Sequence, residues 1–193
     1  MTEPILLLTG FEPFGGRTVN ASWEAVRRVA ERVGPWHVEK RRLPVEFGRA
    51  AALAISEAER LGASALVCVG EAGGRSAVTP ELVAVNLRFA RIPDNAGAVP
   101  LDEPCAPGGE NALFSALPVR AMAEAVKKAG FPAEVSSSAG LYVCNDLFYL
   151  TLRRFGGSLP CGFIHVPTEE RLSPEHCAAA LERALLCIDA TQK

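Results

Sequence analysis

The sequence predicts an α/β protein built as a three-layer α/β/α sandwich, with a mostly parallel central sheet between two layers of helices. Apolar runs of strand length alternate with helix-like patterns from end to end, and this alternation is typical of parallel sheets covered by helices. Several of the runs are almost continuously hydrophobic, as expected for strands buried on both faces. The 193 residues, 49% hydrophobic and 22% charged, have the length and composition of one globular domain.

Five segments have the length and apolar content of strands. They cover residues 4–9, 37–43, 65–69, 133–136 and 161–166. The first, third and last are the nearly continuous hydrophobic runs, so we expect helices on both of their faces.

Five segments have helical patterns, and several carry helix boundary signals. They cover residues 22–33, 47–61, 119–129, 144–155 and 174–189. Gly62 and Gly130 directly follow two of these segments, as glycine commonly does at a helix C-terminus. Ser173 followed by Pro174 indicates an N-cap with proline at the first helical position.

Residues 76–100 interrupt the alternation of strands and helices. The short apolar run 83–87 is followed by a polar segment, 93–97, and by several prolines. We therefore expect an antiparallel excursion and a long loop. Long loops within compact domains are often functional.

Composition excludes several classes of function. Lys and Arg number 20 against 22 Asp and Glu, whereas nucleic-acid binding favours a basic face and a pI above about 9. No apolar run approaches the roughly 18 residues of a membrane span, and the run 5–8 lacks the flanks of a secretion signal. The six cysteines form no C-x-x-C pair. We expect a cytoplasmic protein with reduced thiols, no metal site, and no nucleic-acid or membrane partner.

Two glycine-rich turns and a histidine lie where an α/β sheet places its ligands, beyond the carboxyl ends of strands. Phe11 and Phe14 lie in the first of these turns and predict an apolar pocket wall for an uncharged ligand. The turn continues with Gly16-Arg17-Thr18, so it lacks the lysine that a phosphate-binding P-loop requires.

One thiol and one imidazole are placed for chemistry. Cys144 opens a predicted helix, where the helix dipole and free N–H groups favour a thiolate and can receive an oxyanion. His165 lies near the carboxyl end of a buried strand. A carboxylate would orient the imidazole. Position alone leaves four candidates for it: Glu81, Asp94, Asp102 and Asp146.

Ordered sequence blocks along nearly the whole chain resemble the pyroglutamyl peptidase I family, cysteine peptidases that remove an N-terminal 5-oxoproline. The blocks are residues 9–16 (TGFEPFGG) with Asn20, 43–45 (LPV), 73–75 (GGR), Glu81 with 84–86 (AVN), 90–95 (ARIPDN), 114–118 (FSALP), 138–140 (SAG), 144–145 (CN) and 162–167 (GFIHVP). The resemblance implies a phosphorylase/hydrolase-like fold with one catalytic domain over residues 1–193.

The same resemblance assigns roles to individual residues. It implies Cys144 as nucleophile, His165 as general base and acid, and Glu81 as the carboxylate that orients His165. Further residues would line the substrate pocket: Phe11, Phe14, Ile92, Tyr142 and Val143. Arg91 and the backbone N–H of Cys144 would receive the oxyanion.

The implied reaction is acyl transfer through a thioester on peptides with an N-terminal pyroglutamate, without a cofactor. The flat, uncharged lactam agrees with the aromatic turn. Similar proteins form homodimers or homotetramers, and we expect the same of this chain. Glu71 stands where relatives commonly carry a neutral residue, so we expect this pocket carboxylate to affect substrate preference or pH response.

Two alternative functions stay open on the sequence. A catalytically impaired module could bind pyroglutamyl peptides without cleaving them, and Glu71 is the residue that favours this. An α/β transferase for nucleosides or phosphates is the second, against which the absent P-loop lysine argues.

Overall fold

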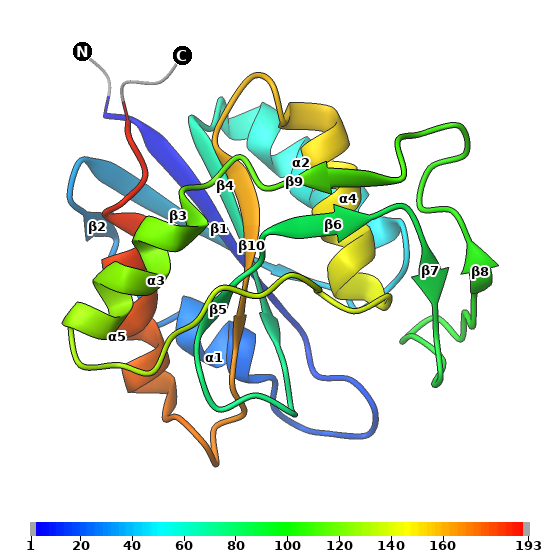
Figure 1. The fold of residues 1–193 in the computed structure, drawn as a ribbon, viewed down its shortest axis with the longest axis horizontal. Helices are drawn as coiled ribbons and strands as arrows, with labels where there is room; N and C mark the ends of the chain where they lie inside the picture. Colours follow the sequence, from blue (N-terminus) through cyan, green and yellow to red (C-terminus); the bar gives the residue numbers. More distant parts are fainter. Residues whose placement is uncertain (1–2, 191–193) are drawn as a thin grey trace.

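The computed structural model describes residues 3–190 and has the predicted α/β architecture (Figure 1). A six-stranded sheet forms its centre, in the order β2–β3–β1–β4–β10–β5. Its strands are β1 (Ile5–Phe11), β2 (Arg32–Val33), β3 (Trp36–Leu43), β4 (Ala65–Glu71), β5 (Thr79–Pro80) and β10 (Cys161–Val166). The four inner strands are parallel, and the two short edge strands β2 and β5 are antiparallel to their neighbours.

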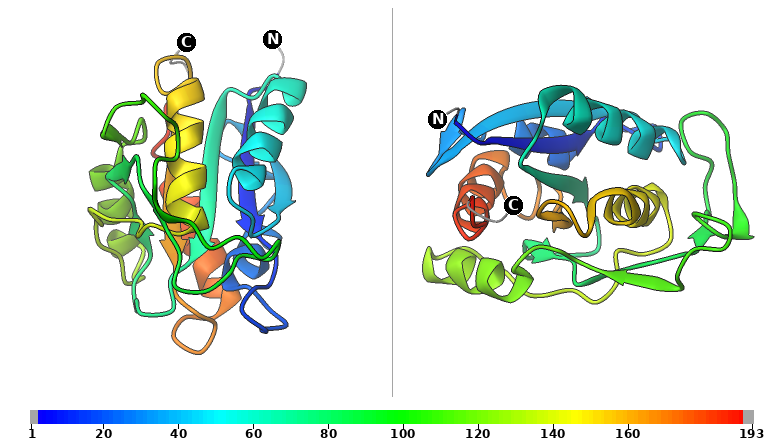
Figure 2. Two further views of the ribbon diagram at one scale, coloured as in Figure 1. Left: turned by 90° about the vertical axis from the view of Figure 1, so that its right-hand side faces the viewer. Right: turned by 90° about the horizontal axis from the view of Figure 1, so that it is seen from above.

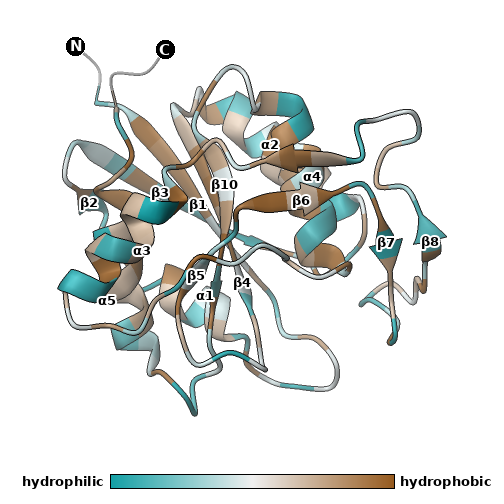
Figure 3. Cartoon of the chain, in the orientation of Figure 1, coloured by the Kyte–Doolittle hydropathy of each residue, from teal (hydrophilic) through white to brown (hydrophobic). Residues whose placement is uncertain are grey.

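Helices cover both faces of this sheet (Figure 2). They are α1 (Ala21–Val26), α2 (Arg49–Leu61), α3 (Val119–Lys128), α4 (Val143–Phe155) and α5 (Pro174–Leu185). Along β1, Leu6 and Leu8 pack with α1, α3 and α5, whereas Leu7 packs with α2 and α4. This alternation follows from the two-residue period of a strand. Strands β1, β4 and β10 are therefore buried along nearly their whole length and are mostly hydrophobic (Figure 3), whereas β3 carries charged and partly exposed residues.

The boundary signals read from the sequence are confirmed. Gly62 and Gly130 adopt φ values of 59° and 91°, the left-handed conformation that glycine accommodates without strain. The Ser173 side chain accepts a hydrogen bond from the His176 N–H, with Pro174 at the start of α5. Strand β10 has the predicted bounds.

Three predicted elements differ from the structure. The helix predicted over 22–33 ends at Val26, because Val33 pairs with Trp36 in a β2–β3 hairpin around a turn in which Gly34 has a φ of 58°. The helix predicted over 174–189 ends at Leu185.

Residues 133–136 do not form the predicted strand. They make only single parallel bridges to the segment beside β5, Val78 with Ala133 and Glu81 with Ser136. Pro80 and Pro132 lack the N–H groups that a continuous ladder would need.

The antiparallel excursion after β4 is confirmed and extends beyond residue 100. Strand β6 (Val83–Val85) pairs with β9 (Ala112–Phe114), and β7 (Arg88–Phe89) pairs with β8 (Leu101–Glu103), all antiparallel. Within residues 3–190, no helix is long and apolar enough to cross a membrane.

Candidate active site

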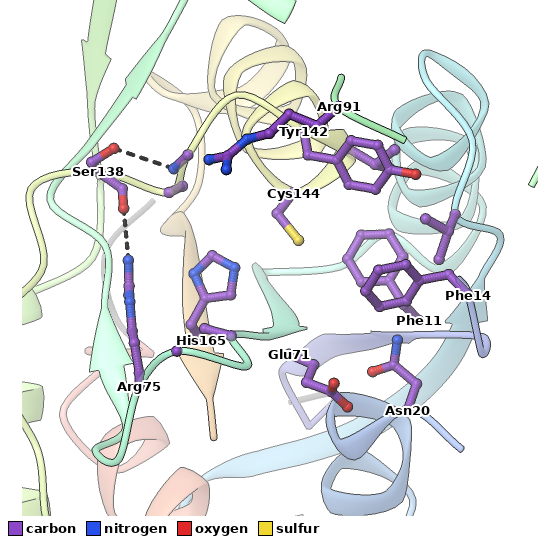
Figure 4. Close-up of a pocket in the computed structure, with 16 residues that line it drawn as sticks. Phe11, Phe14, Asn20, Glu71, Arg75, Arg91, Ser138, Tyr142, Cys144 and His165 are labelled. Carbon is purple, nitrogen blue, oxygen red and sulfur yellow. Dashed lines mark hydrogen bonds between the residues drawn. The ribbon is translucent and has the colours of Figure 1, made fainter. Parts of the chain in front are cut away.

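A cavity of about 500 Å³ opens at the carboxyl ends of β1, β4 and β10, beside the N-terminus of α4 (Figure 4). This is the edge at which open α/β sheets bind ligands. The lining residues come from six separate parts of the chain: Phe11, Phe14, Asn20, Val45, Glu71, Ala72, Gly74, Arg75, Arg91, Ser138, Ala139, Gly140, Tyr142, Val143, Cys144 and His165.

Cys144 is the second residue of α4, and its sulfur lies over Gly70 on β4. A Cβ added at Gly70 would be 2.9 Å from the Cys144 Sγ. His165 on β10 is the parallel register partner of Gly70, and partners on adjacent strands lie about 5 Å apart with side chains on the same face. The thiol and the imidazole therefore meet at one point of the sheet edge, and both face the cavity (Figure 4).

The structure brings Glu81 to His165. The His165 Nδ1 lies 2.7 Å from the Glu81 Oε1, and the Glu81 side chain is fully buried. Because an ionised carboxylate only accepts hydrogen bonds, Nδ1 carries the proton and Nε2 is the free basic nitrogen.

The other three candidate carboxylates have different partners. Asp94 accepts hydrogen bonds from the N–H groups of Phe47, Ala96 and Ala98. Asp146 is paired with Arg88, and Asp102 lies on the exposed strand β8. Of the four carboxylates that position left open, Glu81 is the one hydrogen-bonded to His165.

The thiol is neutral in the resting site, which corrects the expectation of a favoured thiolate. Burial raises the pKa of the Cys144 thiol to about 12, with further upward contributions from Glu81, Cys68 and Glu71, while Arg75 acts to lower it. Burial, the largest of these effects, therefore keeps the thiol protonated at neutral pH.

The imidazole is also neutral. Burial lowers the pKa of His165, although the hydrogen bond and charge of Glu81 act to raise it. Burial acts to raise the pKa of Glu81, but the hydrogen bond and charge of His165, together with Ser136 and Arg75, outweigh it and lower the pKa. The carboxylate is therefore ionised beside a neutral imidazole at neutral pH.

Aromatic and aliphatic side chains form one wall of the cavity. Phe14 and Tyr142 lie with ring centroids 6.3 Å apart, and Phe11 and Val143 are buried beneath them. The Tyr142 hydroxyl donates a hydrogen bond to the Pro93 carbonyl at 3.0 Å, which fixes the ring against the loop that carries Arg91. Of the five residues that the resemblance assigned to the pocket, these four line it.

Ile92 is not among the cavity-lining side chains of the described chain. It is 46% exposed and lies at the rim, where its Cδ1 is 3.9 Å from the position of a Cβ added at Gly15. Its neighbour Arg91 does line the cavity.

Glu71 lines the cavity, but its carboxylate is held by protein groups. One oxygen is paired with Arg17, and the other accepts a hydrogen bond from the Ala21 N–H at 2.7 Å. Glu71 therefore connects the end of β4 to the start of α1 within the cavity wall.

Three polar residues of the cavity, Asn20, Arg75 and Ser138, were not among the predicted site residues. Asn20 caps α1, accepting a hydrogen bond from the Ser22 N–H and donating one to the Glu12 carbonyl. Arg75 contacts Glu81 and the Ser138 carbonyl. All three belong to the blocks that carry the resemblance, and that was the only signal for them in the sequence. In residues 3–190, no group of three or more His, Cys, Asp and Glu side chains could hold a metal ion.

Comparisons with known proteins identify the family of this chain. The sequence model of the family described as "Pyroglutamyl peptidase" matches residues 5–184. The pyrrolidone-carboxylate peptidase of Gloeobacter violaceus is 48% identical over 165 residues, covering 84% of this chain and 80% of the relative. That of Escherichia fergusonii is 43% identical over 177 residues, covering 90% and 83%.

Solved structures agree with the sequence comparisons. The crystal structure of pyroglutamyl peptidase I from Bacillus amyloliquefaciens matches with a TM-score of 0.91 and 41% identity, covering 98% of both chains. Pyrrolidone carboxyl peptidase from Thermococcus litoralis matches with a TM-score of 0.90 and 33% identity, covering 96% of this chain and 93% of the other. The chain therefore belongs to the pyroglutamyl peptidase family of cysteine-type peptidases.

Proposed function

We propose that this chain hydrolyses the amide bond after an N-terminal pyroglutamyl residue through a triad of Cys144, His165 and Glu81 and a thioester acyl-enzyme. The observation that carries the proposal is the 2.7 Å hydrogen bond between His165 and Glu81. It leaves Nε2 as the free base beside the Cys144 sulfur. A nucleophile, a base and an orienting group in this order are the arrangement that nucleophilic catalysis needs.

Acylation begins with proton transfer from the Cys144 thiol to the His165 Nε2 as the sulfur attacks the pyroglutamyl carbonyl carbon. The carbonyl oxygen becomes an oxyanion, which the Cys144 backbone N–H and the Arg91 guanidinium stabilise. The intermediate collapses when the C–N bond breaks, and His165 gives its proton to the leaving amine. The product is a thioester between Cys144 and the pyroglutamyl group.

Deacylation uses the same groups with water as the nucleophile. His165 takes a proton from water as its oxygen attacks the thioester carbon, and the C–S bond then breaks. The proton returns to the Cys144 sulfur, and free pyroglutamate leaves. Glu81 stabilises the imidazolium in both halves of the reaction through the hydrogen bond at Nδ1.

The cavity favours a neutral lactam over a free α-amine. The wall around Phe11, Phe14 and Tyr142 is aromatic, and the nearby Glu71 carboxylate is already paired with Arg17 and the Ala21 N–H. An ammonium group would therefore be desolvated there without a free counter-charge, at a substantial cost. The homodimer or homotetramer and the cytoplasmic location expected from the sequence stay predictions.

The test is hydrolysis of pyroglutamyl-aminomethylcoumarin by the purified full chain. We expect fluorophore release that iodoacetamide blocks and EDTA leaves unchanged, and a loss of at least about 1,000-fold in kcat for Cys144→Ala. Cys187→Ala is the matched control, because this half-buried thiol follows α5, away from the cavity. Full turnover by Cys144→Ala would refute the mechanism, and tight binding without turnover by the wild type would favour the impaired binding module.

A further inference from the structure

Arg75 contacts both Glu81, which is hydrogen-bonded to His165, and the loop that leads to Cys144. It lies in the loop after β4, and its side chain is 25% exposed toward the cavity. One guanidinium nitrogen donates to the Glu81 Oε1 and to the Thr79 hydroxyl. The other donates to the Ser138 carbonyl at 2.7 Å (Figure 4). We propose that Arg75 is a positioning residue, which holds Glu81 toward His165 and holds the loop before Cys144 against the same carboxylate.

The contact with Glu81 is made on the oxygen that His165 also uses. Glu81 Oε1 lies 2.7 Å from His165 Nδ1 and 2.5 Å from Arg75 Nη1. Since the Glu81 side chain is fully buried, its charge needs compensation from close partners. Arg75 supplies a permanent positive charge while His165 is neutral, so the carboxylate stays ionised and oriented between turnovers.

The contact with Ser138 acts on the nucleophile. Ser138 also accepts a hydrogen bond from the Gly140 N–H at 3.2 Å through its hydroxyl, and Gly140 has a φ of 76°, which lets the chain turn toward α4. Cys144 lies six positions after Ser138 along this loop. Arg75 therefore links the loop that leads to the Cys144 thiol with the Glu81 carboxylate that orients His165. A planar guanidinium, which donates hydrogen bonds in two directions, suits this bridge better than a lysine ammonium group.

The charge of Arg75 also acts on the thiol. The groups around the Cys144 sulfur are Glu71 and Cys68 from β4, His165 from β10, Glu81 from the segment after β5, and Arg75 from the loop between these strands. Glu81, Cys68 and Glu71 raise the pKa of Cys144, and Arg75 lowers it. Arg75 also lowers the pKa of His165. Removal of its charge should move both ionisations to higher pH, a change that a purely structural residue would not cause.

The test compares Arg75→Gln and Arg75→Lys with the wild-type chain, and the inference rests on the proposed triad. Arg27→Gln is the matched control, because Arg27 forms an exposed ion pair with Glu24 one helical turn away. We expect Arg75→Gln to lower kcat for pyroglutamyl-aminomethylcoumarin by about 100-fold, the effect typical of a small misplacement of catalytic groups, with KM changed by less than about threefold. Arg27→Gln should match the wild type in both.

The pH dependence of iodoacetamide alkylation separates positioning from stability. In Arg75→Gln the alkylation profile of Cys144 should move to higher pH. Arg75→Lys keeps the positive charge but loses the planar guanidinium that donates to two partners at once. Its alkylation profile should return toward that of the wild type while kcat stays reduced. Thermal unfolding by circular dichroism shows whether each variant is folded at the assay temperature.

Three results would overturn the inference. They are a wild-type kcat in Arg75→Gln, a loss confined to KM, and a lowered melting temperature with an unchanged alkylation profile. Failure of the proposed function is recognised separately. If the wild-type chain releases no fluorophore, the triad mechanism fails, while the alkylation profiles still report whether Arg75 acts on the thiol.

Discussion

Gly70 leaves the space in which the Cys144 sulfur lies. A Cβ at this position would be 2.9 Å from the Cys144 Sγ and 2.8 Å from the Phe163 ring. The Phe163 ring in turn lies 4.8 Å from the His165 ring, centroid to centroid. One added methyl group would therefore press on the thiol and, through Phe163, on the base.

We expect Gly70→Ala to lower kcat for a pyroglutamyl amide by about 100-fold, because the reacting groups are displaced. Overpacking should also lower the free energy of unfolding by about 1–3 kcal/mol. Turnover assays and urea unfolding measure the two effects. Gly157→Ala is the control, since a Cβ there meets no atom within 4 Å. A Gly70→Ala enzyme with wild-type turnover would show that the sulfur does not need this space.

Single residues of the site were predictable where the type of side chain carried the chemistry. Cys144 and His165 followed from a thiol at a helix start and an imidazole at a strand end. The choice of Glu81 over Asp94, Asp102 and Asp146 required the resemblance, because the contacts that separate them are made across the fold. Arg75 was missed because it lies in a loop with no local pattern, and its contact with Ser138 joins residues 63 positions apart along the chain.

Helix α4 is anchored at its first turn by a buried ion pair. Asp146 is fully buried, its Oδ1 lies 2.6 Å from the Arg88 Nε on β7, and its Oδ2 accepts a hydrogen bond from the Gly48 N–H at 2.6 Å. The Arg88 guanidinium lies 5.9 Å from the centroid of the Phe47 ring. Phe47 makes an edge contact with Tyr142 at 5.3 Å. The anchor thus connects α4 to the aromatic wall of the cavity.

We expect Asp146→Asn to destabilise the chain by about 3 kcal/mol, because Arg88 loses its counter-charge in a largely buried site. Loosening of Phe47 and Tyr142 should also raise KM for a pyroglutamyl amide. Urea unfolding and Michaelis kinetics are the measurements. Glu124→Gln is the control, because it breaks only an exposed helix pair with Lys127, which should change stability by less than about 1 kcal/mol. Equal stability of the two variants would contradict the role of the anchor.

Helices and strands were predictable where the apolar residues of a local sequence pattern are also the residues buried in the structure. Strand β10 is buried along its whole length, so its continuous apolar run marked both ends. Helix α1 was predicted too long because Val33 fits a helical face equally well, and only its pairing with Trp36 shows that it belongs to a hairpin. Residues 133–136 have the apolar content of a strand. They pair with residues 78–81 through single bridges only, because Pro80 and Pro132 lack the N–H groups that a continuous ladder needs.

The whole chain has two hydrophobic layers that share one sheet, and we propose that it unfolds as a single cooperative unit. The layer of α1, α3 and α5 and the layer of α2 and α4 both pack on β1, β4 and β10. Alternation along the sequence was enough to predict these layers. The order of strands was not predictable, because pairings such as β4 with β10 join residues almost 100 positions apart.

Buried ionisable groups set the acid limit of stability. Burial lowers the pKa of His165 below its ordinary 6.5, and the pKa of Glu81 lies below its ordinary 4.5 despite burial, mainly because of His165. In both cases the unfolded chain binds more protons than the folded chain. Stability is therefore lost as the pH falls from 6.5 through the folded pKa of His165, and again below pH 4.5 as Glu81 protonates.

Buried thiols set the alkaline limit and give a prediction for the molecule as a whole. Burial raises the pKa of Cys68, Cys105 and Cys177 from 9.0 to about 12. Above pH 9 the unfolded chain loses thiol protons that the folded chain retains. The free energy of unfolding of the protein should therefore fall by about 1 kcal/mol for each buried thiol and each pH unit. Urea unfolding at pH 8, 9 and 10 measures this slope.

The contribution of one thiol can be isolated on helix α5. Cys177 is buried in the layer that α1, α3 and α5 form, whereas Cys187 beyond the helix is half-buried. Cys177→Ala creates a cavity and lowers stability at every pH, but it also removes one buried thiol. Its loss of stability between pH 9 and 10 should therefore be smaller than that of the wild type by about 1 kcal/mol. The slope of Cys187→Ala should stay closer to the wild-type value. Equal slopes for Cys177→Ala and the wild type would mean that buried thiols do not limit stability at alkaline pH.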